Sequence, residues 1–254
     1  MAAGTRRYLW EMTERRESTA GAAPEVSERL GEHVREVVEE VVEEVKPHLR
    51  GWLHAATAPL ALAAGIVLVA LSPTVSTRLG SAVFAGSALA LFTASATMHR
   101  GTWSGRTALW LRRVDHASIF LLIAGSYTPF TLLLLDGRER TTLLVIAWGG
   151  AVLGILFRLT WTSAPRWLYT PIYIALGWAS VFYLPAFFET ANGPVITCMV
   201  LGGALYTIGG IIYGFRWPDP SPRWFGFHEV FHSLTIAAFV SHYVGVSIAT
   251  YALR

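Results

Sequence analysis

The chain has 254 residues, of which 53% are hydrophobic and only 15% are charged. Soluble domains carry roughly 25% charged residues, so the composition excludes an ordinary soluble protein. The formal net charge of +3 does not indicate a nucleic-acid partner, because the Arg residues after position 50 separate apolar runs instead of forming a patch. The single Cys198 excludes an intramolecular disulfide.

The front of the chain differs from the rest, because only six of the 17 acidic residues lie beyond residue 45. Residues 1–23 contain no apolar core of a signal peptide, and we expect a disordered tail there. Val and Leu recur at helical spacing over 24–49, which predicts an amphipathic acidic helix on the cytoplasmic face. Self-association through residues 24–45 as a coiled coil is the alternative.

Seven apolar segments follow, each near the ~20 residues that a helix needs to cross a bilayer. They therefore predict an all-α membrane protein whose domain, residues 50–254, is a seven-transmembrane helix bundle. Gly and Pro inside these segments are tolerated in membrane helices. The expected spans are 52–72, 80–99, 116–135, 141–160, 167–188, 194–215 and 228–251.

Basic residues predict the orientation of the bundle. Eight Arg residues lie in the second, fourth and sixth connections, against four in the other connections and the C-terminus. Since cytoplasmic loops are enriched in Lys and Arg, the N-terminus should be cytoplasmic and the C-terminus outside. We expect a multi-pass protein of the cell (inner or plasma) membrane, in contact with membrane lipids.

Histidines then gather at one predicted depth. His228 and His232 stand at positions i and i+4 at the start of the last span, on one helix face and about 5–6 Å apart. With this orientation, His99 at the end of the second span lies at the same membrane face. Three neutral imidazoles suit Zn²⁺ and leave its fourth position for water. We therefore predict a zinc site formed by His99, His228 and His232.

Asp115, at the start of the third span, and Ser95, one turn before His99, complete the predicted site. Asp115 would orient the water and accept its proton, and Ser95 would hold the water or a substrate carbonyl. Both are candidate catalytic residues. His242 lies deeper and is expected to be a packed, hydrogen-bonding residue. His54 and His116 are expected to be interfacial.

His228-Glu-Val-Phe-His232 also fits the His-Glu-x-x-His pattern of metalloproteases, in which Glu229 would be the general base. An intramembrane protease of this kind often takes a third ligand from a later span, and no further span follows here. Glu229 is turned about 100° from His228 on a helix, which is poor placement for metal ligation.

Four ordered stretches resemble the hemolysin III family, the bacterial branch of the progestin and adipoQ receptor (PAQR) superfamily. They are Lys46-Pro-His-Leu-Arg-Gly-Trp-Leu-His54, Ser95-Ala-Thr-Met-His99, the run from Asp115-His to Thr128-Pro129, and Phe227-His-Glu-Val-Phe-His232. The resemblance implies a seven-helix bundle with a zinc ion held by His99, His228 and His232. It places Asp115 and Ser95 beside the zinc-bound water.

Three functions are compatible with these features. The first is a zinc-dependent hydrolase of lipid amide or ester bonds, similar to the ceramidase-like activity of eukaryotic relatives, with a role in membrane lipid homeostasis. The second is a non-enzymatic sensor or receptor of membrane state with structural zinc. The third is a cytolytic protein or channel, which the small number of polar side chains in spans four to six disfavours.

Overall fold

The structure, a computed structural model, describes residues 47–253. The predicted tail, 1–23, and all but the last three residues of the predicted acidic helix, 24–49, lie outside the described residues. Residues 48–50 form a turn that leads into the first membrane helix.

The described residues form helices joined by short connections and contain no strand. The connection before the last helix has one isolated β-bridge, between Ser221 and Phe225. Seven segments are long and apolar enough to cross a membrane, as predicted. The helices are α2 (Trp52–Leu71), α3 (Val75–Arg100), α4 (Gly105–Leu134), α5 (Gly137–Thr160), α6 (Arg166–Gly177), η1 (Trp178–Tyr183), α7 (Leu184–Thr190), α8 (Gly193–Phe215) and α9 (Phe227–Tyr251).

Two segments differ from the expected spans. The helix α4 begins at Gly105, eleven residues before the expected start at 116, because an apolar run marks the membrane's thickness and not the end of a helix. The fifth span is continuous in the prediction but is divided into α6, the 3₁₀ segment η1 and α7. Pro171 is accommodated inside α6, whereas Pro185 stands in the first turn of α7.

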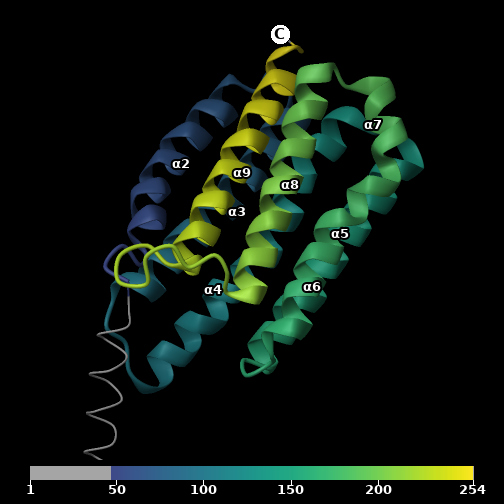
Figure 1. Ribbon diagram of the computed structural model, residues 1–254. Helices are drawn as coiled ribbons and strands as arrows, with labels where there is room; N and C mark the ends of the chain where they lie inside the picture. The colour runs from purple at the N-terminus through teal and green to yellow at the C-terminus, as the bar shows by residue number, and fades with distance from the viewer. Residues whose placement is uncertain (1–46, 254) are drawn as a thin grey trace, which may run out of the picture. The chain divides into compact units, whose positions relative to one another are not determined.

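Consecutive helices pack side by side, and α9 also packs against α2, which closes the bundle (Figure 1). The helix α4 lies at the centre: it contacts α3, α5, α6, α7 and α9, and 67% of its most apolar window is buried. The fifth span is the least buried of the seven, since only 6% of its most apolar window is buried. The most deeply buried part of the bundle is therefore around α3 and α4, whereas α6, η1 and α7 lie largely at its surface.

Small residues bring α3 and α4 together. Gly125 of α4 lies directly against Ser87 of α3, and Gly80 of α3 lies against the backbone of Pro129. A methyl group at Gly125 would overlap the Ser87 side chain. Such small contacts allow helix backbones to approach closely in a membrane, where packing replaces the hydrophobic effect as the driving force.

The segment that precedes α2 is held by the connection between α8 and α9. The amide of His48 donates to the carbonyl of Arg223 at 2.9 Å, and the amide of Leu49 donates to that of Trp224 at 3.3 Å. The His48 and Trp224 rings stack obliquely at 4.5 Å. These contacts bring the start of α2 beside the start of α9, where two of the predicted metal ligands lie.

Candidate metal centre

The three predicted ligands come together in space. His99 lies in the last turn of α3, and His228 and His232 lie in the first two turns of α9. One ligand atom from each ring lies within 4.8 Å of the other two. Nε2 of His99 and Nε2 of His228 are 3.2 Å apart.

This geometry fits a tetrahedral ion. Two nitrogens bound to Zn²⁺ at 2.0–2.1 Å with a tetrahedral angle lie about 3.3 Å apart. Nδ1 of His232 is buried without a hydrogen-bond partner in the described part of the chain, and a buried polar atom in that state is costly unless something binds it. Both observations fit a site that could hold a metal ion, and three imidazoles are a donor set that suits zinc among other divalent metals.

The start of α9 is fixed by Glu229. Its carboxylate accepts a hydrogen bond from the backbone amide of Gly226 at 2.9 Å, as in a capping box, and forms an ion pair with Nε of Arg50. The Glu229 side chain is fully buried. The carboxylate thus serves as a helix cap and as the partner of Arg50, which does not match the general base of a metalloprotease.

Gly51 allows the chain before α2 to pass close to His99. Its φ is +79°, in the left-handed region that glycine adopts at low cost. A Cβ atom at this position would lie 2.8 Å from Cβ of His99. Only glycine therefore fits both the backbone conformation and the space beside this ligand.

Asp115 and Ser95 lie beside the three histidines, as the sequence predicted. Oδ2 of Asp115 is 3.9 Å from Nε2 of His99, too far for a hydrogen bond but suitable for a bridging water. Ser95 is 2% exposed and its side chain interacts with the Asp115 carboxylate. The structure thus brings all five predicted residues together.

His54, expected at the interface, is instead buried at 2% exposure. Its ring stacks on His232 with centroids 3.8 Å apart and planes inclined by 19°. Phe92 packs against the same ring edge-on at 5.1 Å. Sequence reasoning missed this contact because nothing in the pattern of α2 indicates which neighbour it faces.

His116 also faces inward, in contrast to the expectation of an interfacial residue. Its Nδ1 is 2.8 Å from the carbonyl of Arg112 and therefore donates to it, which leaves Nε2 to accept from the hydroxyl of Tyr213 at 3.4 Å. Tyr213 in turn bonds Tyr169 at 3.1 Å. Oδ2 of Asp115 lies 3.6 Å from Nδ1. His116 thus belongs to a polar network on the α6 and α8 side of Asp115.

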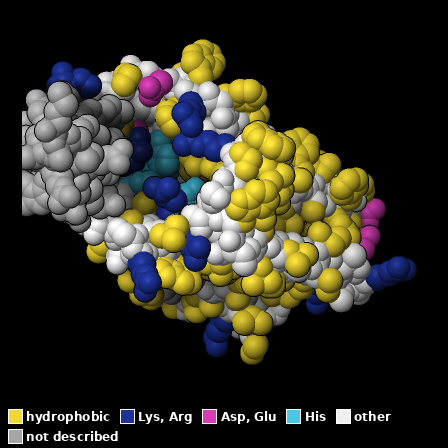
Figure 2. All heavy atoms as spheres, turned by 90° about the horizontal axis from the view of Figure 1, so that it is seen from below, with side chains coloured by type: hydrophobic (Ala, Val, Ile, Leu, Met, Phe, Trp, Pro, Cys, Tyr) yellow, Lys and Arg dark blue, Asp and Glu magenta, His cyan; other side chains and the backbone are white. Residues whose placement is uncertain are grey.

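A cavity of about 400 Å³ extends from the histidines into the bundle. Ser95, Asp115, His228 and His232 line one end, and mostly apolar side chains of α4, α6, η1 and α8 line the rest. His242 lies deep in it, with its Nε2 3.3 Å from the carbonyl of Met199. Seen from the end of the bundle, histidine side chains lie in a recess with basic side chains nearby (Figure 2).

Comparison with known proteins identifies the family. The family model described as haemolysin-III related matches residues 42–243, which include every residue of the site. The chain belongs to the haemolysin-III related family. The resemblance inferred from the four sequence stretches is therefore confirmed.

Named relatives of this haemolysin-III related chain include two bacterial proteins and one animal protein. It is 36% identical over 131 residues to the Hemolysin-3 homolog of Bacillus subtilis, covering 52% of this chain and 61% of the relative. It is 37% identical over 100 residues to Hemolysin-3 of Bacillus cereus, covering 39% of this chain and 46% of the relative. It is 26% identical over 155 residues to the adiponectin receptor protein of Drosophila melanogaster, covering 53% and 34%. The alignments thus span less than two thirds of each relative, and the last fits the PAQR superfamily.

Proposed function

We propose that this protein is a zinc-dependent hydrolase that cleaves an amide or ester bond of a membrane lipid. The observation that carries the proposal is the cluster of three histidines, of which His228 and His232, together with Asp115, line a cavity of about 400 Å³. Ligand sites are cavities of this size, mainly apolar, with a few convergent polar groups. A lipid acyl chain suits the apolar part, and its carbonyl suits the polar end.

His99, His228 and His232 would hold the ion through neutral ring nitrogens. Zinc supplies Lewis acidity, which polarises a carbonyl and makes a bound water acidic. The chain would supply proton transfer: Asp115 accepts a proton from the attacking water and returns it to the leaving nitrogen or oxygen as the carbonyl–heteroatom bond breaks. Ser95, in contact with Asp115, would hold this carboxylate in position.

The low burial of the fifth span supports entry of substrate from the bilayer. Trp178 of η1 and Val200 of α8 line the cavity and are each about half exposed, at 51% and 53%. A lipid that passes between these elements would place its chain in the cavity without leaving the membrane. Release of the products would follow the same path.

We propose further that the N-terminus is cytoplasmic and that the protein resides in the cell membrane. Eight Arg residues in the second, fourth and sixth connections support this orientation, against four on the other side. The metal centre, at the ends of α3 and α9 nearest the Arg-rich connections, would then face the cytoplasmic leaflet.

Lipidomics of the purified, zinc-loaded protein tests the activity. We expect incubation with native lipids or with ceramide to release a fatty acid, and His99→Ala to release none. Asp115→Ala should keep one zinc per chain but reduce turnover by about 10²–10⁴-fold, the usual contribution of a general base. Full turnover by zinc-loaded Asp115→Ala would refute the role of Asp115.

The same experiment separates the enzyme from a sensor with structural zinc. A sensor would bind one zinc per chain and release no product from any bilayer lipid. Because the ion would then have only a structural role, Asp115→Ala would change neither the zinc content nor any lipid. Zinc content measured in the same samples makes this result distinct from a simple failure to load the metal.

A further inference from the structure

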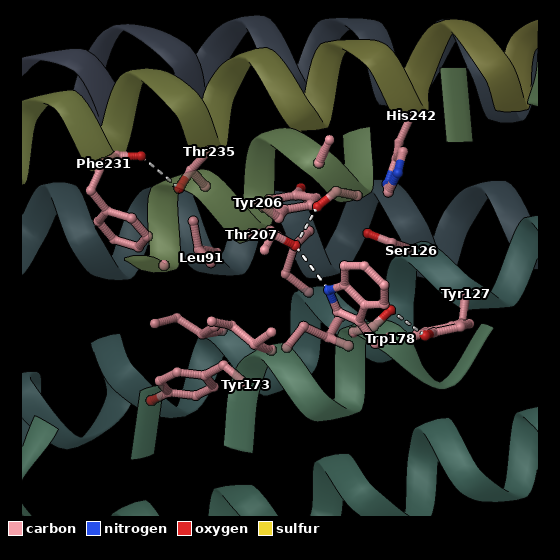
Figure 3. Close-up of a pocket in the computed structure, with 18 of the residues that line it drawn as sticks. Leu91, Ser126, Tyr127, Tyr173, Trp178, Tyr206, Thr207, Phe231, Thr235 and His242 are labelled. Carbon is pink, nitrogen blue, oxygen red and sulfur yellow. Dashed lines mark hydrogen bonds between the residues drawn. The ribbon is translucent and has the colours of Figure 1, made fainter. Parts of the chain in front are cut away.

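The deep end of the cavity contains a second polar cluster, formed by Ser126 of α4, Tyr206 of α8 and His242 of α9 (Figure 3). No member of this cluster is an acid or a permanently charged base. His242 lies ten residues beyond His232 on α9, which is about 15 Å along the helix axis. The cluster is therefore separate from the metal centre, but it lines the same cavity.

The polar atoms of the cluster lack hydrogen-bond partners. Oγ of Ser126, the hydroxyl of Tyr206 and Nδ1 of His242 are all buried without a partner among residues 47–253. Ser126 is 7% exposed, and its hydroxyl lies near that of Tyr206 without a well-formed bond between them. Buried polar groups normally have hydrogen-bond partners, above all in a membrane. Three unpaired polar atoms in one place therefore indicate a ligand group that forms hydrogen bonds with them.

Two other polar side chains of the same cavity, Thr207 and Thr235, have hydrogen-bond partners. Thr207 accepts a hydrogen bond from the Trp178 indole at 3.0 Å and donates to the carbonyl of Gly203 at 2.8 Å. The hydroxyl of Thr235 donates to the carbonyl of Phe231 at 2.9 Å. Unpaired atoms also occur on His54, Thr170 and His232 elsewhere in the lining, and the Ser126, Tyr206 and His242 cluster is the group of them at the deep end of the cavity.

The surroundings hold the His242 ring in place. Tyr206 and Phe130 contact it from two sides with centroids 5.6 Å away. Gly202 lies against the ring, and any side chain there would overlap it. The ring is thus enclosed and has little freedom to turn toward other partners in the bundle.

The hydrogen bonds of His242 decide which ligand group it accepts. A backbone carbonyl only accepts, so Nε2, which faces the Met199 carbonyl, carries the hydrogen. Nδ1 is then an acceptor and needs a donor. The hydroxyls of Ser126 and Tyr206 each donate and accept. An alcohol group can donate to Nδ1 and accept from a hydroxyl, whereas a ketone or ester carbonyl leaves Nδ1 unpaired.

We propose that Ser126, Tyr206 and His242 form a binding site for a hydroxyl group carried part-way along the acyl chain of a lipid whose head lies at the metal centre. This inference names the substrate class and rests on the proposed lipid-binding function. It makes the cavity selective for hydroxylated chains over plain saturated chains. It does not depend on the hydrolytic step, because occupancy alone fills the cluster.

Competition binding to the purified full-length protein tests the site. Stearic acid, hydroxystearic acids with the hydroxyl near the head or at mid-chain, and a mid-chain ketone would compete with a fluorescent fatty acid. We expect a mid-chain hydroxyl to improve binding about tenfold over stearic acid, as one or two added hydrogen bonds allow. The ketone and the acid hydroxylated near its head should not gain this advantage.

Tyr206→Phe and Ser126→Ala should each reduce the preference for the hydroxyl, while Thr235→Val, which changes a paired hydroxyl of the same cavity, should retain it. The zinc content of Tyr206→Phe, which removes one oxygen, confirms that the site is folded. Equal binding of stearic and hydroxystearic acids by the native chain would overturn the proposal, as would an unchanged preference in Tyr206→Phe. Free fatty acids contain no amide or ester bond, so the assay measures the binding preference even if the protein has no hydrolase activity.

Discussion

Nε2 of His99 and Nε2 of His228 lie 3.2 Å apart, although 129 residues separate them in the chain. A single ion between them would connect the end of α3 to the start of α9. Two neutral imidazoles can share one hydrogen at this distance, but two charged rings would repel each other. Metal binding at this point should therefore stabilise the packing of two helices that are distant in sequence.

Removal of the metal should lower the melting temperature of the purified protein. An ion present at about 100 times its dissociation constant stabilises the folded state by about 2.7 kcal/mol, or roughly 5–10 °C for a chain of this size. Melting curves with zinc and with a chelator measure the difference. His99→Ala should melt at the same temperature under both conditions, and a zinc-dependent shift in that variant would contradict the ligand assignment.

The stacking of His54 on His232 should affect metal affinity. His54→Ala removes a ring that lies 3.8 Å from the His232 ring and supports it, and loss of such a supporting contact weakens metal binding about 10–100-fold. His54→Phe keeps an aromatic face and should bind zinc more tightly than His54→Ala. Titration with a competing chelator measures both affinities. Equal affinities in the two variants would show that stacking does not position His232.

Much of the site follows from the sequence, because two local rules apply to it. Helical spacing places His228 and His232 on one face, and the alternation of spans brings the ends of α3 and α9 to one side of the membrane. Neither rule requires knowledge of which helices touch. The depth of Asp115 follows in the same way, although α4 begins ten residues before it.

Contacts between distant segments were not predictable. The burial of His54, the pairing of Arg50 with Glu229 and the inward face of His116 depend on which helices are neighbours and how each is rotated. Hydropathy gives the length of a span but not its rotation. The interruption at η1 was missed for a related reason, since Pro171 and Pro185 stand in one apolar run yet only Pro185 lies at a helix start.

Gly51→Ala should weaken both folding and metal binding. Alanine in the left-handed conformation costs about 1 kcal/mol or more, and its methyl would press on Cβ of His99. Gly86→Ala is the matched control, because a methyl there has open space within α3 and alanine favours a helix by about 0.5–1 kcal/mol. Melting temperature and zinc affinity should fall in Gly51→Ala only. A loss of zinc affinity in both variants would exclude a specific effect at His99.

The orientation can be tested with cysteine labelling after Cys198→Ser has removed the only native thiol. Ser104→Cys lies between α3 and α4, and Arg138→Cys lies near the start of α5, at the opposite end of α4. If the N-terminus is cytoplasmic, an impermeant maleimide should label Arg138→Cys in intact cells and Ser104→Cys only after permeabilisation. The reverse pattern would place the metal centre at the outer leaflet and overturn the proposed topology.

Loss of one member of the Arg50 and Glu229 ion pair should lower the stability of the fold more than neutralisation of both. Glu229→Gln leaves the Arg50 guanidinium without its partner beside a fully buried side chain. Breaking a buried ion pair costs about 3–5 kcal/mol, and the partial exposure of Arg50, at 19%, places the expected loss near the lower end. Glu229→Gln combined with Arg50→Gln removes both charges and should recover part of the stability. Denaturant unfolding of the native chain, both single variants and the double variant yields the coupling free energy. Additive losses in the double variant would mean that the pair contributes no coupling, and that Glu229 stabilises α9 through its bond to Gly226 alone.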